Sequence, residues 1–332
     1  MDQERFDRVV DRLVAARPDG LRMSTLVVSS PGGEFVHDFT AVRSPMVDLR
    51  SITKAVVALA VGAAVADGAC LRGRPLSLDL PIWPYFPEFV GRQPEANREH
   101  LHAVRLRHLL TSTTGHAEGF LFRQDVAGRD REALLDYIFA RELAHAPGSH
   151  FAYSNAGWYL ISAMVRNELG VGLGDWVGDL VLAKLGITAV TWVTYGRYEA
   201  AATGLSMSAV DLATVGRLLL AGGVHQGRQV VPASWIERMR YPAVRTSSAY
   251  DPGLRAHGYG LGLWICDGGT YYCDGTGGQF LIVVPRTETV IVALAGRGHA
   301  DGVPVPARRA VSQVLASGCR NPSPSMAARS MA

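Results

Sequence analysis

The sequence predicts an α+β fold, in which one antiparallel sheet is assembled from both ends of the chain and flanked by helices. Two patterns support this prediction. Runs rich in β-branched residues occur before residue 41 and after residue 255, whereas apolar residues at helical spacing dominate residues 51–225. Strands at both termini with helices between them indicate one sheet with a mostly helical lobe inserted into it.

The N-terminal end supplies a helix and two strands. Residues 4–17 place apolar side chains on one face of a helix. Residues 24–30 and 34–40 are extended segments that flank Pro31-Gly32-Gly33, so we expect a hairpin there.

The middle of the chain is predicted to form helices separated by loops that contain proline and glycine. We expect helices over residues 51–67, 130–145, 157–169 and 208–221. Residues 92–99 have no apolar periodicity and are expected to form a flexible loop.

Strands return near the C-terminal end. They are expected over residues 258–266, 270–273, 279–284 and 289–295, with turn residues between them. A last helix over residues 306–316 precedes residues 321–332, which are expected to form a disordered tail.

Composition argues for an enzyme-sized globule. The chain has 332 residues, of which 48% are hydrophobic and 19% charged, so it can bury a large core and is not a disordered chain. The net charge is +3 and the basic residues are scattered, which makes nucleic acid an unexpected partner.

Neither a metal nor another cofactor is expected. The histidines at 100, 102, 108 and 116 lack a metal-binding spacing. The four cysteines form no CxxC pair or regular framework, which indicates a reducing compartment; they are Cys70, Cys266, Cys273 and Cys319.

The expected location is the cytoplasm. The first residues are charged and contain no apolar segment or cleavage site of a signal peptide. The longest uncharged apolar run, residues 55–66, is 12 residues long, against the roughly 20 that cross a bilayer. We therefore expect no membrane contact; the oligomeric state is open.

Ser51-Ile52-Thr53-Lys54 opens the most apolar helix, which places a hydroxyl and an amine one turn apart on the same face. A serine hydroxyl needs a base to become a nucleophile. Lysine can be that base if burial lowers its pKa from about 10.4 to near 7, which means destabilising the ammonium by roughly 4–5 kcal/mol.

The choice of lysine supports this interpretation. Only two of the 33 basic residues are lysines, Lys54 and Lys184, and arginine cannot be deprotonated at working pH. The alternative is that Ser51 caps the helix and the Lys54 side chain extends to solvent. Taken alone, the two interpretations are evenly matched.

A second element is the triplet Tyr153-Ser154-Asn155, in a loop that runs into a helix. A phenol near a lysine can relay a proton, and a carboxamide can orient the lysine and contact a substrate carbonyl. The alternative is a buried tyrosine followed by an asparagine helix cap, and by itself that alternative would be favoured.

Together these elements resemble the serine hydrolases of the class C β-lactamase and penicillin-binding-protein superfamily, which includes esterases, amidases and acyltransferases. Asp48–Lys54 resembles the family's nucleophile segment, and Arg105–His116 its LLTHTSG loop. Pro147–Gly157 resembles the PGxxFxYSNxG segment, and Gly204–Ser206 the later GL region. The motifs occur in one order through most of the chain.

The resemblance implies a role for each matched residue. Ser51 is the acylated nucleophile, and Lys54 and Tyr153 share the general-base and general-acid work. It also implies a single β-lactamase-like catalytic domain over residues 1–320. One lobe takes about 1–50 and 225–318, and a mainly helical lobe takes about 51–224.

The third motif departs from the family pattern. The family carries Lys-Thr-Gly or His-x-Gly on a strand, and here the match is Cys273-Asp274-Gly275. A neutral thiol at the usual place of a cation puts recognition of a carboxylate in doubt, so we expect poor turnover of a cephalosporin.

The segment that follows is expected to contribute backbone groups to the site. The amides of Ser51 and Thr276 would form an oxyanion hole. Asn155, Asp274 and Gly275 would contact the substrate. Alternatively, the run of glycines after Asp274 is a bulge or bend in an edge strand.

The leading prediction is a serine hydrolase that acts on a small ester or amide through an acyl-enzyme on Ser51. An acyltransferase that uses the same intermediate, with an acyl acceptor as second substrate, remains open. So does a ligand-binding sensor that keeps the fold without turnover.

Overall fold

A computed structural model gives the structure of the protein and describes residues 1–15, 23–43, 45–93, 95–246, 254 and 256–295. The predicted helix over 306–316, the predicted tail and Cys319 lie outside the described residues.

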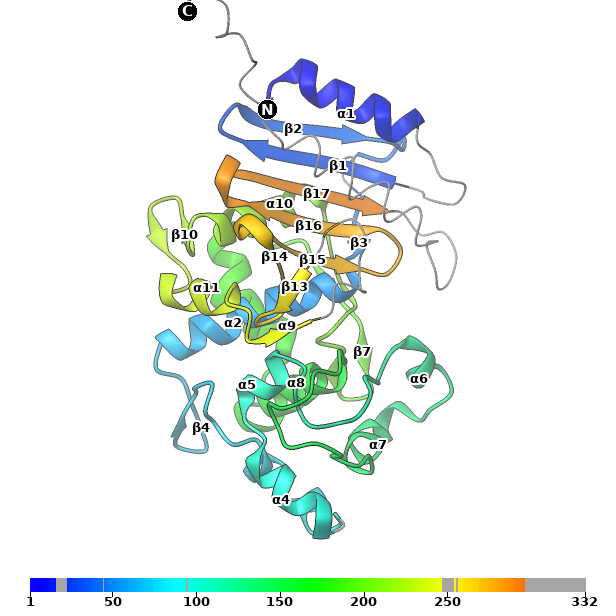
Figure 1. Ribbon diagram of the computed structural model, residues 1–332, viewed down its shortest axis with the longest axis vertical. Helices are drawn as coiled ribbons and strands as arrows, with labels where there is room; N and C mark the ends of the chain where they lie inside the picture. Colours follow the sequence, from blue (N-terminus) through cyan, green and yellow to red (C-terminus); the bar gives the residue numbers. More distant parts are fainter. Residues whose placement is uncertain (16–22, 44, 94, 247–253, 255, 296–332) are drawn as a thin grey trace, which may run out of the picture.

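An eight-stranded antiparallel sheet forms the frame, in the order β12-β13-β14-β15-β16-β17-β1-β2 (Figure 1). Its strands are β1 (Met23–Ser30), β2 (Gly33–Asp38), β12 (Val244–Arg245), β13 (Ala256–Tyr259), β14 (Trp264–Cys266), β15 (Tyr271–Gly275), β16 (Gln279–Val284) and β17 (Thr289–Ala295). The N-terminal strand β1 pairs with β17, with Val27 opposite Val292. The predicted fold class, with a sheet drawn from both chain ends, is therefore confirmed.

The sheet is apolar on both faces because side chains alternate along each strand. Leu26, Val28 and Ile282 face the helix α1 (Gln3–Ala15), whose Phe6 stacks on Phe35 of β2. On the other face Val27, Leu281 and Val290 join the main core, against the helix α10 (Ala209–Leu220). Gly216 of α10 lies against Val290 and Leu281, where a Cβ atom would overlap both side chains.

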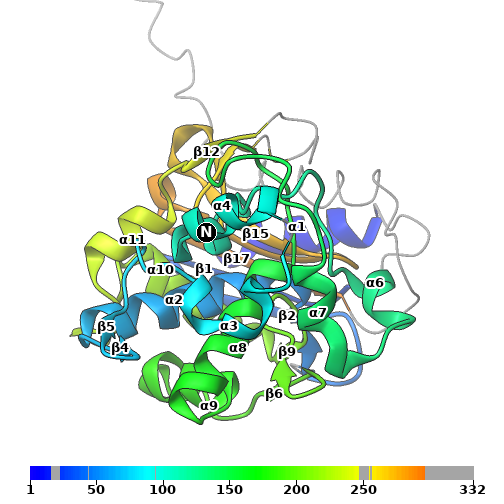
Figure 2. The ribbon, with the colours of Figure 1, turned by 90° about the horizontal axis from the view of Figure 1, so that it is seen from below.

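The remaining helices lie away from α1, and α2 among them is buried along most of its length (Figures 1 and 2). They are α2 (Thr53–Ala66), α3 (Pro87–Val90), α4 (Glu95–Ala103), α5 (Leu106–Leu110), α6 (Arg123–Ala127), α7 (Leu134–Phe139), α8 (Ala156–Leu169), α9 (Leu173–Val177) and α11 (Ala233–Met239). In the described ranges, every helix is too short or too polar to cross a bilayer.

Short strands connect these helices. A three-stranded sheet joins β3 (Val47–Asp48), β9 (Leu205–Met207) and β6 (Thr191–Trp192). The two-stranded pairs are β4 (Cys70–Leu71) with β5 (Arg74–Pro75), β7 (Thr194–Tyr195) with β8 (Tyr198–Glu199), and β10 (Val224–His225) with β11 (Arg228–Gln229).

Two predictions in the helical region are wrong. The helix expected over 130–145 begins as predicted, with a 3₁₀ turn at Arg131–Ala133 that leads into α7, but it ends at Phe139. The backbone amides of Leu143 and His145 donate to Asn97 Oδ1 and the carbonyl of Gly115 instead of continuing the helix. The flexible loop expected over 92–99 contains the start of α4. Asn97 is buried there, and its contact with Leu143 stabilises the helix through tertiary structure.

The strand expected over 258–266 is also wrong, because it is two strands. β13 ends at Tyr259 and β14 begins at Trp264. Between them the amide of Gly260 donates to Leu263 O at 2.8 Å, and Gly262 has a φ of +78°, in the left-handed region that favours glycine. These glycines turn the chain back on itself.

Candidate active site

Ser51 lies in a 3₁₀ turn, Arg50–Ile52, that leads directly into α2. Its hydroxyl oxygen is 3.1 Å from Lys54 Nζ. The side chains of Ser51 and Lys54 therefore meet on one face, as the sequence spacing predicts, although Ser51 stands in the 3₁₀ turn and not in the α-helix itself.

Lys54 is completely buried, and its amine has three oxygen neighbours. In addition to Ser51 Oγ, they are Asn155 Oδ1 at 2.8 Å and the carbonyl of Ala202 at 3.3 Å. A neutral amine has two N–H donors and one lone pair. The two acceptors therefore use the donors and leave the lone pair for the Ser51 hydroxyl.

Burial lowers the pKa of Lys54 to about 7, and the nearby Asp274 carboxylate opposes this by raising it. The ammonium form loses its hydration in the core, whereas the neutral form does not. Near neutral pH a substantial fraction of the protein therefore carries an uncharged amine beside the Ser51 hydroxyl.

Asn155 and Tyr153 come from the loop before α8. The Asn155 Nδ2 group donates to Leu121 O at 3.0 Å, which turns its Oδ1 atom toward Lys54. The Tyr153 ring centroid is 4.7 Å from Lys54 Nζ, and the ring stacks on Trp264 with centroids 5.4 Å apart. The structure thus brings both predicted residues to Lys54.

The end of β15 lies against the Ser51 turn. A Cβ atom on Gly275 would lie 2.6 Å from the carbonyl oxygen of Leu49 and 2.7 Å from Arg50 Cβ, so only glycine allows this approach. Thr276 follows directly and begins the turn between β15 and β16. The strand end and the Ser51 turn are neighbours, as the predicted oxyanion hole requires.

Cys273 and Asp274 point to opposite faces of β15. Cys273 is buried in the main core, where burial and the Asp274 carboxylate raise the pKa of its thiol. Asp274 accepts a hydrogen bond of 3.1 Å from the indole of Trp264, which carries the stack on Tyr153. Asp274 is therefore on the Tyr153 side, and the Cys273 thiol is a core side chain.

Sequence reasoning missed two contributors, the Ala202 carbonyl and Trp264. A backbone acceptor has no residue-type signature, because any residue at position 202 supplies one. Trp264 lies inside a segment expected to be one long strand, so nothing in the sequence placed its ring against Tyr153.

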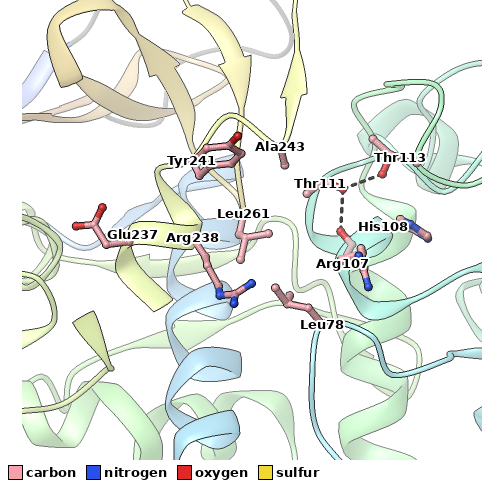
Figure 3. Close-up of a pocket in the computed structure, with 11 residues that line it drawn as sticks. Leu78, Arg107, His108, Thr111, Thr113, Glu237, Arg238, Tyr241, Ala243 and Leu261 are labelled. Carbon is pink, nitrogen blue, oxygen red and sulfur yellow. Dashed lines mark hydrogen bonds between the residues drawn. The ribbon is translucent and has the colours of Figure 1, made fainter. Parts of the chain in front are cut away.

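A cavity of about 660 Å³ opens elsewhere, between α5 and α11 (Figure 3). Arg107 and Arg238 extend from its opposite walls on either side of Leu78. The predicted catalytic and substrate-binding residues are not part of its lining. In the part of the chain that the structure describes, no group of three or more His, Cys, Asp or Glu side chains could hold a metal ion.

Comparison with known proteins gives a family match and several relatives. Residues 43–316 match the model of the beta-lactamase family. The chain is 30% identical over 176 residues to 6-aminohexanoate-dimer hydrolase of Paenarthrobacter ureafaciens, covering 50% of this chain and 45% of that protein. It is 32% identical over 152 residues to esterase EstB of Burkholderia gladioli, covering 42% and 36%. The matches thus span less than half the length of these curated relatives.

Among solved structures, EstCE1, described as a hydrolase with promiscuous acyltransferase activity, superimposes with a TM-score of 0.71 at 17% identity. The superposition covers 94% of this chain and 98% of EstCE1, and at that identity it supports the fold. The family match extends over most of the sequence, so the chain belongs to the beta-lactamase family, and the resemblance indicated by the motifs is confirmed.

Proposed function

We propose that the protein is a serine hydrolase that cleaves a small ester or amide through an acyl-enzyme on Ser51. The observation that carries this proposal is the completely buried Lys54 amine, 3.1 Å from the Ser51 hydroxyl and with its pKa lowered to about 7. Such an amine can take the hydroxyl proton as the oxygen attacks a carbonyl carbon.

The proposed reaction has two halves. In acylation, Ser51 Oγ bonds to the substrate carbonyl carbon, its proton passes to Lys54, and the alcohol or amine leaves after receiving a proton through Tyr153. In deacylation, water attacks the ester on Ser51, and the same two groups return the proton to Ser51 Oγ. Acid product and free enzyme result.

The developing negative charge on the carbonyl oxygen needs donors in a fixed place. We assign this role to the backbone amides of Ser51 and Thr276, with support from the packing of Gly275 on the Ser51 turn. Asn155 keeps Lys54 in place through its 2.8 Å contact, and we expect Asn155, Asp274 and Gly275 to contact the substrate.

The substrate class follows from the relatives. An esterase and a hydrolase of the 6-aminohexanoate dimer, whose two halves are joined by an amide, both point to small esters and amides. The position of Cys273 in the core supplies no cation for a carboxylate, so a β-lactam is not the substrate that we propose.

Acyl transfer is the second candidate, because the structurally similar EstCE1 carries out both hydrolysis and transfer. The two reactions differ only in whether water or another nucleophile attacks the acyl group on Ser51.

Intact-protein mass spectrometry tests the proposal. The protein is incubated with p-nitrophenyl esters of short acids, or with a fluorophosphonate, beside Ser51→Ala. We expect turnover of the esters and a covalent fluorophosphonate adduct that the Ser51→Ala variant lacks. A stable adduct without turnover would indicate a sensor, and no adduct would refute the acyl-enzyme. Added alcohols that divert the product to a new ester would indicate transfer.

A further inference from the structure

The Asp48 side chain lies between the Ser51 turn and the loop that contacts Lys54. One of its oxygens, Oδ1, accepts the backbone N–H of Arg50 at 2.8 Å and that of Gly204 at 3.2 Å. The other oxygen, Oδ2, lies 3.3 Å from Arg50 Nη1 in an ion pair. A single carboxylate thus connects two segments 156 residues apart in the sequence.

The first of these segments needs such a partner. Arg50 precedes Ser51 and has a φ of +54°, a left-handed conformation that residues other than glycine seldom adopt. The hydrogen bond from its own N–H to Asp48 holds it in that conformation. The direction in which the chain enters the Ser51 turn therefore depends on Asp48.

The second segment supplies an acceptor to Lys54. Gly204 lies two residues after Ala202, whose carbonyl is 3.3 Å from Lys54 Nζ. The loop is also tied at Leu205, whose carbonyl accepts the Leu49 amide at 2.8 Å. Of these two bonds between the loop and the segment before Ser51, the one from Gly204 to Asp48 is closer in sequence to Ala202.

We propose that Asp48 is a positioning residue, which holds Ser51 Oγ and the Ala202 carbonyl at their places on Lys54 Nζ through its two backbone hydrogen bonds. This deepens the proposed function, on which the kinetic part of the test rests. The acceptor oxygen carries the effect, and the ion pair with Arg50 is secondary, because that guanidinium and carboxylate are both partly exposed.

The chain allows a direct test because it contains only two lysines. Full-length protein labelled with ¹³C and ¹⁵N in lysine gives one signal for Lys54 and one for Lys184, and Lys54→Arg assigns them. The midpoint of the Lys54 titration is measured in the wild type, Asp48→Ala, Asp48→Asn and Arg50→Ala. Asp274 is the charged group that acts on Lys54 and is unchanged in all four.

We expect Asp48→Ala to lower the Lys54 midpoint by about half a pH unit or more, because the ammonium loses the Ala202 acceptor that stabilises it. Asp48→Asn keeps an acceptor oxygen and should leave the midpoint in place. Arg50→Ala removes only the ion pair and should do the same.

The kinetic part uses an ester that the wild type hydrolyses. Asp48→Ala should lower kcat by about 50-fold with KM within about twofold, while Asp48→Asn stays within about threefold of the wild type. Simple unfolding would instead reduce the number of active sites titrated by a fluorophosphonate and leave the rate of each site unchanged.

Several outcomes would overturn the positioning role. In the titration, they are a Lys54 midpoint that is unchanged in Asp48→Ala, or one that rises because water reaches the amine. In the kinetics, they are an Asp48→Asn variant as impaired as Asp48→Ala, or an activity loss explained entirely by fewer active sites. If wild type and Ser51→Ala had equal activity, the proposed function would fail, yet the titration would still decide the role of Asp48.

Discussion

Burial lowers the pKa of two bases of this protein, Lys54 and His116, yet we propose a catalytic role for Lys54 only. Burial lowers the pKa of Lys54 to about 7, and burial together with the charge of Arg141 lowers that of His116 to about 4. Lys54 meets a hydroxyl, a carboxamide and a carbonyl. His116 has a hydrogen bond of 2.8 Å with Thr114 and a ring contact with Phe120.

The difference shows that a displaced pKa marks a buried group and does not by itself mark a site. His116 borders a cavity of only about 30 Å³, about large enough for one water molecule. Both bases have a hydroxyl within hydrogen-bond distance, Ser51 for Lys54 and Thr114 for His116. Lys54 differs in its contacts with the Asn155 carboxamide and the Tyr153 ring, and in the glycine-bearing strand end that packs on the Ser51 turn. These contacts are the reason that we propose Lys54, and not His116, as the base.

Lys54→Arg is the substitution at these two bases that should reduce activity most. A guanidinium stays protonated and cannot accept the Ser51 proton, so esterase activity should fall by about 10³-fold or more. Initial rates with p-nitrophenyl esters measure this, and circular dichroism checks that the variant folds. Activity close to that of the wild type would mean that another group is the base.

Gly275→Ala tests whether the strand end must touch the Ser51 turn. The added methyl group would overlap the Leu49 carbonyl, which forces β15 away from the turn. Because displacements of about 1 Å can cost 10²-fold in rate, we expect a loss of that order in kcat. Gly268→Ala is a control without such an overlap, since the space around Gly268 is open, although its own φ of +70° disfavours alanine. Equal losses in both variants would contradict the special role of Gly275.

The pH profile of activity tests whether Lys54 is the titrating base. Only the neutral amine can act as base, so kcat/KM should fall about tenfold per unit as the pH drops below about 7. Above about pH 7, kcat/KM should no longer rise with pH. A profile that keeps its full rate down to pH 5 would exclude Lys54 as the titrating base.

Replacement of His116 should have the smallest effect on activity. We expect His116→Gln to keep kcat/KM within about twofold, because His116 has no contact with Ser51 or Lys54 in its hydrogen bonds. Its effect is on stability. Since the folded pKa of about 4 lies below the unfolded value of about 6.5, the unfolded state binds the extra proton between them.

Wild-type stability should therefore fall further than that of His116→Gln as the pH drops from 6.5 to 4, by about 3 kcal/mol. Urea unfolding at pH 7 and pH 4 measures the difference between the two proteins. Parallel losses in both would show that His116 is not the buried base described above.

Local patterns predicted much of the structure. The hairpin at residues 23–38 and the apolar helix after Ser51 follow from alternating and continuous apolar residues, and both are present. The predictions failed where long-range contacts decide. α4 forms in a segment without apolar periodicity because Asn97 is buried against Leu143. The helix expected over 130–145 ends early because the Leu143 amide donates to Asn97.

By itself, the sequence predicted the fold class from strand patterns at both chain ends, and it predicted the Ser51–Lys54 pair and the Tyr153–Asn155 loop from motifs at short spacings. Only the tertiary structure decided which atoms surround the Lys54 amine, and with them its pKa. The Ala202 carbonyl, the Trp264 stack and the Asp48 hydrogen bonds come from segments distant in the chain. Burial and the placement of backbone acceptors result from tertiary packing, so a local sequence pattern does not predict them.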